Sequence, residues 1–498
     1  MKNLPAKMFC GMFAAGVCSG LSLSLPYVSA IVSVLSCALA LQVVRGVKTI
    51  KEEVFRFSWF VSGFVLGGIH WVGLAIYRPP ANDLIDTTAL CAVLMGFHAL
   101  IYVSAFGIVR FSVSWLFPRS RRTMLLPCVA VAWALAELVR GVGPWALPWG
   151  ALGYSQIENP ILRGLYPITG SIGVSGAVWL LAGFFVGASS CVRERFSHRE
   201  LTKFNPSFGW GVAFVVVGLC AQFVSWTTLS NHALTVRVVH TNWPEEDKYT
   251  AENQLSALTL LRDAADVGGT DLIVFPELFL VQRAGLLPQD YRSGVVRATA
   301  RSGTALMFGE PGLVLFGGGE NKANQNTLVL IDSSGKTTTY AKEVLLPFSE
   351  YFPTTPVLRW AYPFLYRYPL ADLYAGDAKQ PMMSLKNVPL GVTICNELAY
   401  PGKAARQASN AEVLVNASSD SWVSSKFYLL QAQSLARVRA MEAQKPLIRA
   451  NNVGPSAFIS PDGKVIGSVW ISGSADLQVL GRVGNTPFVR MASMLSRF

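Results

Sequence analysis

The chain has 498 residues and a mean hydropathy of +0.38, and only 14% of its residues are Asp, Glu, Lys or Arg. Because soluble proteins carry about 25% charged residues, this composition excludes an ordinary soluble enzyme and favours a membrane protein. The formal net charge of +12 does not indicate nucleic-acid binding, because many basic residues cluster between apolar runs.

Apolar runs fill the first 229 residues, at 8–25, 27–44, 57–77, 87–109, 124–139, 168–190 and 208–229. Most have the roughly 17–25 residues that cross a bilayer, although the run at 124–139 is short. The first run follows Lys2 and Lys7 as in a signal peptide, but six further runs favour a retained helix. We therefore predict a membrane domain at 1–229 with about seven transmembrane helices.

Basic residues in the loops predict the orientation of these helices. They follow the second, fourth and sixth spans, whereas alternate connections such as 78–86 carry few. The basic residues are Arg45, Lys48, Lys51, Arg56, Arg110, Arg119, Arg121, Arg122, Arg193, Arg195, Arg199 and Lys203. Because positively charged loops stay in the cytoplasm, seven spans place the chain after residue 229 outside, and one miscounted span would reverse this.

The segment 140–167 is not a span, but it is rich in Trp, Pro and Gly and includes Trp149 and Tyr154. Such a segment suits the membrane interface, either as a loop without chemistry or as the lining of a lipid-facing cavity. Glu137 and Arg140 end the fifth span. They either have a function or form an i,i+3 ion pair that only stabilises the helix end.

From about residue 232, short β-rich runs alternate with helical ones. The predicted strands are 234–239, 272–275, 305–308, 327–331, 390–394, 413–415 and 447–450, and the predicted helices are 251–266 and about 427–442. Strands that alternate with helices predict an α/β domain, which we place at 230–485. A short tail, 486–498, follows it.

Several residues at the ends of these strands could carry chemistry. The strand at 272–275 leads to Glu277, the strand at 390–394 leads to Cys395, and the segment 340–353 presents Lys342 and Glu350. Strand ends are where α/β folds place their active sites. Cys395 is the only cysteine after residue 220, which excludes a disulfide or a Cys-rich metal site in this half.

A thiol at position 395 needs activation, because the thiolate is the nucleophile. The second half has only His232 and His240, both at its entry, so a Cys–His pair would require His240 to swing in. Glu277 in an apolar surround could instead accept the thiol proton. Lys342 could stabilise the thiolate and then an oxyanion, which backbone N–H groups after Cys395 could also bind.

Each candidate also has an ordinary structural interpretation. Cys395 alone would be a buried packing residue, Lys342 a surface lysine, and Glu277 the cap of a following helix. Glu350 and Glu397 could be ion-pair partners. Three candidates on strand ends, with no competing nucleophile, favour the joint catalytic interpretation.

At these residues the chain resembles the nitrilase (carbon–nitrogen hydrolase) superfamily, whose site is a Glu-Lys-Cys triad on an αββα sandwich. Pro-Glu at 276–277, Lys342 and Ile-Cys-Asn-Glu at 394–397 stand in the expected order. A nitrilase-like domain after several spans is similar to the apolipoprotein N-acyltransferase family. Further matching segments are 137–141, 148–149, 153–156, 346–353, 420–422, 436–440 and 449–452.

The resemblance implies a role for each residue of the site. Glu277 would be the base, Lys342 the electrostatic stabiliser and Cys395 the nucleophile. The supporting residues would be Glu350, beside the lysine, and Asn396 and Glu397, beside the thiol. Residues expected on the substrate side are Tyr249, Trp149, Tyr154 and Trp422.

The resemblance also implies a two-step reaction in the bacterial inner membrane, with the catalytic domain on the periplasmic side. Cys395 would take an acyl chain from a phospholipid as a thioester and pass it to the amino-terminal cysteine of a diacylglyceryl apolipoprotein, the last step of lipoprotein maturation. We expect no metal, no organic cofactor and no nucleic acid, and a monomer is the simplest assembly. The alternatives are a membrane-tethered amidase with the same triad, and a lipid-binding protein with an inactive domain, which the intact triad disfavours.

Three departures from the family pattern bear on these expectations. Position 396 is Asn where many members carry Tyr, and position 249 is Tyr rather than Trp, so donor preference is open. The family usually ends in a further span, but 486–498 is too short to be one. It is either a small amphipathic piece on the membrane or the end of a truncated sequence. A mobile lid is expected at 353–375, which is rich in aromatic residues and Pro.

Overall fold

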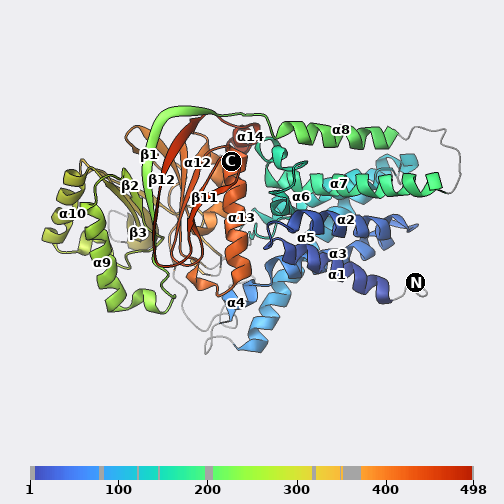
Figure 1. Cartoon of the computed structure of the whole chain (residues 1–498). Coiled ribbons are helices and arrows are strands. Elements are labelled where there is room, and N and C mark those ends of the chain that lie inside the picture. Colours follow the sequence, from blue (N-terminus) through green and yellow to red (C-terminus); the bar gives the residue numbers. More distant parts are fainter. Residues whose placement is uncertain are drawn as a thin grey trace. The chain divides into compact units, whose positions relative to one another are not determined.

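The computed structural model describes residues 6–77, 83–120, 123–143, 146–196, 206–316, 321–347, 349–351 and 372–495. It consists of two compact units, Met1–Val224 and Ser225–Phe498. The described elements of the first unit are all helical, and the strands belong to the second unit (Figure 1).

The helices of the first unit are α1 (Ala6–Ser22), α2 (Ser29–Arg45), α3 (Ile50–Ile69), α4 (Val72–Ile76), α5 (Leu84–Leu116), α6 (Leu125–Arg140), α7 (Tyr166–Phe196) and α8 (Pro206–Ala221). Two helical stretches, Leu84–Leu116 and Arg163–Ser189, are long and apolar enough to cross a membrane. Three shorter apolar helices are Ala6–Ser22, Ser29–Arg45 and Gly211–Ala221.

The predicted boundaries of the third and fourth spans were wrong because buried charges extend the helices. The third run was predicted at 57–77, but α3 begins at Ile50 and ends at Ile69. Arg110 was assigned to a loop, but it lies inside α5, where its Nε donates to Glu53 of α3 over 2.8 Å. Each charge is buried against the other, so hydropathy alone mistakes helix for loop at both places. The seventh run was predicted to reach residue 229, but α8 ends at Ala221.

Helices α1 and α3 approach closely through glycines spaced four residues apart. A Cβ added at Gly16 would lie 2.1 Å from the carbonyl oxygen of Phe60, and one added at Gly63 would lie 2.1 Å from that of Phe13. Gly20 and Gly67 make similar approaches. Backbone contact through such small-residue spacing is typical of helix pairs in membranes.

The second unit contains two six-stranded sheets. The first has the order β12-β1-β2-β3-β4-β5 and the second the order β11-β10-β9-β8-β7-β6. The strands of the first sheet are β1 (Thr228–His240), β2 (Leu272–Val274), β3 (Ala305–Phe316), β4 (Asn321–Ile331), β5 (Thr337–Ala341) and β12 (Gly473–Val483). Those of the second are β6 (Met383–Leu385), β7 (Val388–Ile394), β8 (Val413–Ser418), β9 (Leu447–Asn451), β10 (Ser456–Ile459) and β11 (Val465–Val469).

The two sheets pack face to face between helical layers. One apolar core joins Val236 and Leu272 of the first sheet with Val392 and Val415 of the second. Helices α9 (Ala251–Asp266) and α10 (Gln289–Ser302) cover the first sheet through a separate core. Helices α12 (Pro401–Ala408) and α13 (Lys426–Ala443) pack against the second sheet. The predicted αββα sandwich is therefore confirmed for this unit, whose layers Figure 1 shows.

The parallel centre of each sheet positions the site. Strand β2 pairs in parallel with β1 and β3, and β8 pairs in parallel with β7 and β9. Parallel strands bring their carboxyl ends to one edge of a sheet, where loops carry functional residues.

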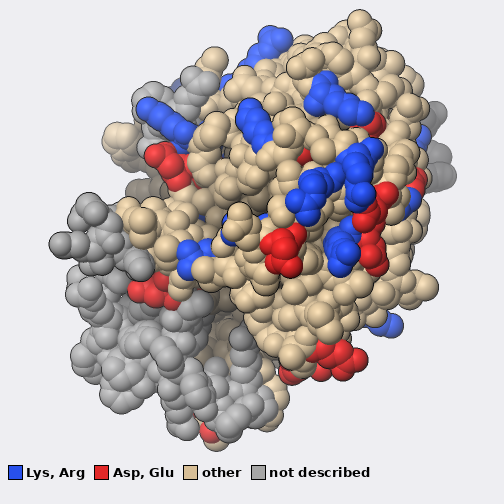
Figure 2. Space-filling model, turned by 90° about the vertical axis from the view of Figure 1, so that its left-hand side faces the viewer, with Lys and Arg blue, Asp and Glu red and all other residues tan. Residues whose placement is uncertain are grey.

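The tail forms a helix, α14 (Pro487–Leu495), that belongs to the packing of this unit. Phe488 and Val489 are buried, whereas Met491 and Leu495 are exposed. The segment predicted to lie on the membrane as an amphipathic piece is thus a helix with one face on α12 and α13, and its contact with the membrane stays a prediction. On the face of this unit that carries α9 and α10, Lys and Arg side chains are interspersed with Asp and Glu (Figure 2). An ion pair joins Arg301 of α10 to Asp266 of α9.

Candidate active site

Glu277 lies just beyond β2, and its carboxylate is held from three directions. Oε1 accepts hydrogen bonds from Asn326 Nδ2 (2.7 Å) and Lys342 Nζ (3.3 Å), and Oε2 accepts one from the backbone N–H of Ser419 (3.0 Å). No helix follows it directly, so the helix-cap interpretation was wrong. The side chain is buried and aligned by both sheets, because Asn326 lies on β4 and Ser419 follows β8.

The turn after Glu277 has a constrained backbone. Leu278 has φ 45°, in the left-handed region that favours glycine. Gly309 of β3 passes so close that a Cβ there would lie 2.3 Å from the nitrogen of Leu278. The Gly309 N–H donates to the carbonyl of Pro276 (3.2 Å), so β3 fixes the position of the Glu277 backbone.

Lys342 follows β5 and is almost completely buried, which rules out the surface-lysine interpretation. Its Nζ donates to Glu350 Oε1 (2.8 Å) as well as to Glu277. Burial alone would lower the pKa of Lys342, but the carboxylates of Glu350 and Glu277 raise it well above its ordinary value. The side chain is therefore a fixed ammonium group.

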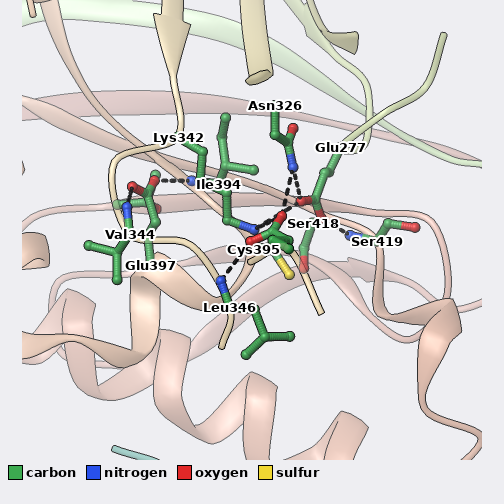
Figure 3. A network of polar contacts seen from close by, with 12 residues as sticks. Glu277, Asn326, Lys342, Val344, Leu346, Ile394, Cys395, Glu397, Ser418 and Ser419 are labelled. Carbon is green, nitrogen blue, oxygen red and sulfur yellow. Dashed lines mark hydrogen bonds and ion pairs between the residues drawn. The ribbon is translucent and has the colours of Figure 1, made fainter. Parts of the chain in front are cut away.

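Cys395 is the first residue after β7 and has φ 50°, so the thiol stands on a sharp turn from the strand into a 3-10 helix (Cys395–Ala399). Figure 3 shows Glu277, Lys342 and Cys395 gathered at the same place. Burial and the Glu277 carboxylate raise the pKa of the Cys395 thiol, and the Lys342 ammonium opposes this. Burial and the Glu277 charge therefore favour the protonated thiol, and the Glu277 carboxylate lies close to it as a candidate proton acceptor (Figure 3).

Glu350 fixes the lysine and its own loop. While Oε1 binds Lys342, Oε2 accepts the backbone N–H of Leu346 (2.7 Å). Asn326 Nδ2 also donates to Glu350 (3.3 Å), so this amide bridges Glu277 and Glu350. The two carboxylates thus hold one ammonium group between them.

Glu397 joins the nucleophile strand to the lysine loop. Its Oε1 accepts the backbone N–H groups of Glu343 (2.8 Å) and Val344 (3.1 Å), and its Oε2 accepts that of Ile394 (2.8 Å). The Tyr340 hydroxyl lies 3.0 Å from both oxygens. The carboxylate therefore fixes the backbone on either side of the site (Figure 3).

Asn396, the other predicted supporting residue, is buried beside the thiol position. Within the described chain, neither its side-chain oxygen nor its nitrogen has a hydrogen-bond partner.

His240, the alternative base, has Nδ1 3.2 Å from Ser456 Oγ, and no described hydrogen bond joins its ring to Cys395.

The predicted substrate-side residues differ in exposure. Tyr249 is 55% exposed, and its hydroxyl lies 3.4 Å from Glu245. Trp422 packs edge-on against Tyr428, with ring centroids 5.4 Å apart. In the first unit, Trp149 and Tyr154 are buried. Most of the predicted lid, 353–375, lies outside the described residues.

Glu137 and Arg140 hold the segment that contains Trp149. Glu137 accepts hydrogen bonds from Trp133 Nε1 (2.8 Å) and the backbone of Leu152 (2.8 Å). Arg140 Nη2 donates to the carbonyl of Trp149 (2.8 Å). Among the described residues no ion pair joins the two side chains, so the ion-pair interpretation was wrong.

A buried polar network behind the thiol was not predicted in this role. Asp420 Oδ2 accepts hydrogen bonds from Arg449 Nη2 (2.5 Å) and Asn451 Nδ2 (2.8 Å). Arg449 Nη1 donates to Asn416 (2.6 Å), whose amide reaches the carbonyl of Cys395 at 3.4 Å. The network fixes the end of β8. The sequence shows that these charged residues lie at the ends of apolar strands, which could have marked them as candidates. It does not show which of them pair with each other.

Lys248 was also missed. Its Nζ donates to the carbonyl of Glu277 (3.3 Å) and to Ser419 Oγ (3.1 Å), and the side chain is buried.

No group of His, Cys, Asp or Glu in the described ranges is arranged to hold a metal ion.

Comparison with known proteins gives two family matches. The carbon–nitrogen hydrolase family model matches residues 235–473, and the model of the apolipoprotein N-acyltransferase N-terminal domain matches residues 15–184. The chain is similar to the apolipoprotein N-acyltransferase of Nitrosomonas europaea, with 28% identity over 97% of this chain and 93% of that protein. It is 30% identical to that of Pseudomonas putida over 83% of this chain and 79% of that protein.

Among solved structures, the chain is similar to an amidase of Nesterenkonia AN1 from the nitrilase superfamily. The match has 17% sequence identity and a TM-score of 0.36, and it covers 54% of this chain and 98% of that chain.

Proposed function

The chain belongs to the apolipoprotein N-acyltransferase family, and we propose that it moves an acyl chain from a membrane phospholipid to a diacylglyceryl apolipoprotein through a thioester on Cys395. The acceptor is the α-amino group of the apolipoprotein's amino-terminal cysteine. The observation that supports this proposal most directly is the Lys342 ammonium, which binds Glu277 and Glu350 beside a buried thiol.

In the first step, Glu277 accepts the proton of the Cys395 thiol, and the thiolate attacks the ester carbonyl of the phospholipid. Lys342 and backbone N–H groups after Cys395 stabilise the oxyanion. Glu277 returns the proton to the glycerol oxygen as the C–O bond breaks. The products are a lysophospholipid and the Cys395 thioester.

In the second step, the uncharged α-amine of the acceptor attacks the thioester. Glu277 takes a proton from the amine nitrogen and delivers it to the departing sulfur, which regenerates the thiol. The intermediate separates the two substrates, so the reaction follows ping-pong kinetics.

The proposal includes a multi-pass location in the bacterial inner membrane with the second unit on the periplasmic side. The two long apolar helices, the glycine contacts between α1 and α3 and the distribution of basic residues support it. Both substrates are lipids anchored in the bilayer, which gives the catalytic unit a reason to be attached to membrane helices. A reporter enzyme fused after residue 229 is expected to be active only outside the cytoplasm, and activity inside would refute this orientation.

The acyl transfer is tested by incubating the purified protein with phospholipid and locating the acyl mass by mass spectrometry. We expect an adduct on Cys395 that persists until a diacylglyceryl peptide with a free amine is added. The Cys395→Ala variant should carry no adduct, whereas a variant of an exposed cysteine, Cys220→Ala, should behave as wild type. Rapid release of free fatty acid without the peptide would instead support an amidase-type hydrolase. Absence of any adduct, with lipid still bound, would support a binding protein.

A further inference from the structure

Lys248 is a buried lysine whose position is fixed by its surroundings. It lies in a single 3-10 turn, Asp247–Tyr249, between β1 and α9. Its backbone N–H donates to the carbonyl of Pro244 (3.0 Å), and its own carbonyl accepts Gln254 Nε2 (2.7 Å). The side chain is only 2% exposed, so its ammonium group cannot rely on water for solvation.

The contacts of this ammonium lead directly to Glu277. Nζ donates to the backbone carbonyl of Glu277 and to the hydroxyl of Ser419. The N–H of Ser419 in turn binds the Glu277 carboxylate (3.0 Å). Lys248 therefore holds the backbone of the base and the residue that orients its side chain.

The charges of Glu277, Glu350 and Lys342 balance only if Lys248 is counted with them. Glu277 and Glu350 are two carboxylates that share one ammonium, Lys342. Asp420 is already paired with Arg449. One buried negative charge would remain uncompensated without Lys248, and such a charge is costly away from water.

This balance matters when the thiol loses its proton. If the proton moves from Cys395 to Glu277, the number of charges stays constant, but a negative charge moves onto the sulfur. With Lys248 present, Glu277, Glu350, Cys395, Lys342 and Lys248 together carry no net charge before and after this transfer. Without it, Lys342 and Glu350 cancel each other, and the thiolate would be a buried negative charge with no cation of its own, which disfavours its formation.

Negatively charged groups face Lys248 and favour its charged form. Burial lowers its pKa, whereas Glu245, Glu277 and the Cys395 thiolate oppose this shift. The ring of Tyr249 lies 6.0 Å from Nζ. Glu245 is partly exposed and accepts a hydrogen bond from Ser421, so water screens its charge more than that of Glu277.

We propose that Lys248 is the second cation of the active site, a positioning residue that fixes Glu277 and offsets the negative charge of the Cys395 thiolate. The inference rests on the proposed function, because it assigns Lys248 to the same thiol. It predicts that thiol reactivity, and not only turnover, depends on the charge at position 248.

The test is the rate at which iodoacetamide alkylates Cys395 in the purified full-length protein between pH 6 and 10, followed by mass spectrometry of the peptide. In Lys248→Met, we expect the pH–rate profile to move upward by about one pH unit and the rate at pH 7 to fall about tenfold. Lys248→Arg, which restores the charge, should recover most of the rate.

Lys445→Met is the matched control. Lys445 is equally buried, but its Nζ donates to the carbonyls of Ala408 and Ala411, so its loss should leave the alkylation profile unchanged. An unchanged profile in Lys248→Met, or an equal shift in Lys445→Met, would overturn the proposal. If Lys248→Met does not fold, Lys248→Gln replaces it, since it keeps a donor and removes the charge.

The alkylation assay needs no lipid, so it separates this proposal from the proposed function. A wild-type protein that forms no thioester but shows the Lys248-dependent profile would refute acyl transfer alone. A thioester that forms equally fast in Lys248→Met, with an unchanged alkylation profile, would refute the role of Lys248 alone.

Discussion

Replacing Glu397 with Gln tests whether one carboxylate fixes the relative position of Cys395 and Lys342. Both carboxylate oxygens accept backbone N–H groups, with Glu343 and Val344 at one oxygen and Ile394 at the other. A Gln side chain has only one acceptor, so its NH₂ group must face a backbone N–H that it cannot bind.

The expected cost follows from that mismatch. A buried donor without a partner costs about 1–3 kcal/mol. For a domain of this size, about 2 kcal/mol corresponds to a fall in Tm of about 4–8 °C. The two segments would also separate, and a displacement on the order of 1 Å at a reacting centre costs about 100-fold in rate.

The assay combines thermal unfolding in detergent with the rate of thioester formation, measured for Glu397→Gln and for the exposed control Glu252→Gln. The control should change Tm by less than about 1 °C and leave the rate unchanged. If Glu397→Gln lowers Tm but forms the thioester within about threefold of the wild-type rate, Glu397 stabilises the fold without aligning the site. An unchanged Tm would refute the hydrogen-bond argument itself.

Three further predictions concern the same unit. Glu277→Gln removes the proton acceptor, so thioester formation should fall about 10²–10⁴-fold in single-turnover measurements, and a fall of less than tenfold would contradict its role as base. Arg449→Met leaves Asp420 buried without its ion pair, so thermal melts should show a free energy of unfolding that is lower by about 3–5 kcal/mol. A second change, Asp420→Asn, should restore part of this stability, and equal stability of the single and double variants would contradict the prediction. Because burial and Glu277 raise the pKa of Cys395, alkylation of the wild-type thiol should increase with pH throughout the range 6–9, and a plateau below pH 8 would show that the thiol is already ionised.

Helices and strands whose bounds are marked by their own or adjacent residues were predicted well. The helix at 251–266 was predicted with the observed ends of α9, whose Thr250 side chain caps it by accepting the N–H of Asn253. The central strands β2, β7 and β8 are buried on both faces, so they form continuous apolar runs that sequence reveals.

Elements that depend on distant partners were missed or misplaced. Strand β11 lies at the edge of its sheet and is largely exposed, so it has no strong apolar pattern. Strand β10, which pairs with it, is buried but is only four residues long. The start of α3 was misplaced because Glu53 is neutralised by Arg110, which lies on another helix. Hydropathy along the chain cannot show which charges meet in space.

The candidate site divides in the same way. Glu277 and Cys395 could be found because each follows an apolar strand of a predicted α/β domain. Lys248 could not, because its turn has no strand pattern and its contacts with Glu277 and Ser419 appear only when both sheets are in place.

The left-handed backbone at Cys395 affects which residues can replace this cysteine in related proteins. A non-glycine residue at φ 50° costs roughly 1–2 kcal/mol, and the proposed reaction requires sulfur at this position. A duplicated copy of the gene that no longer supports the reaction would no longer require cysteine there. In such copies we expect glycine or asparagine at this position more often than alanine or valine, because both adopt a positive φ at lower cost. Glycine or asparagine here would therefore indicate a related protein that has lost the reaction.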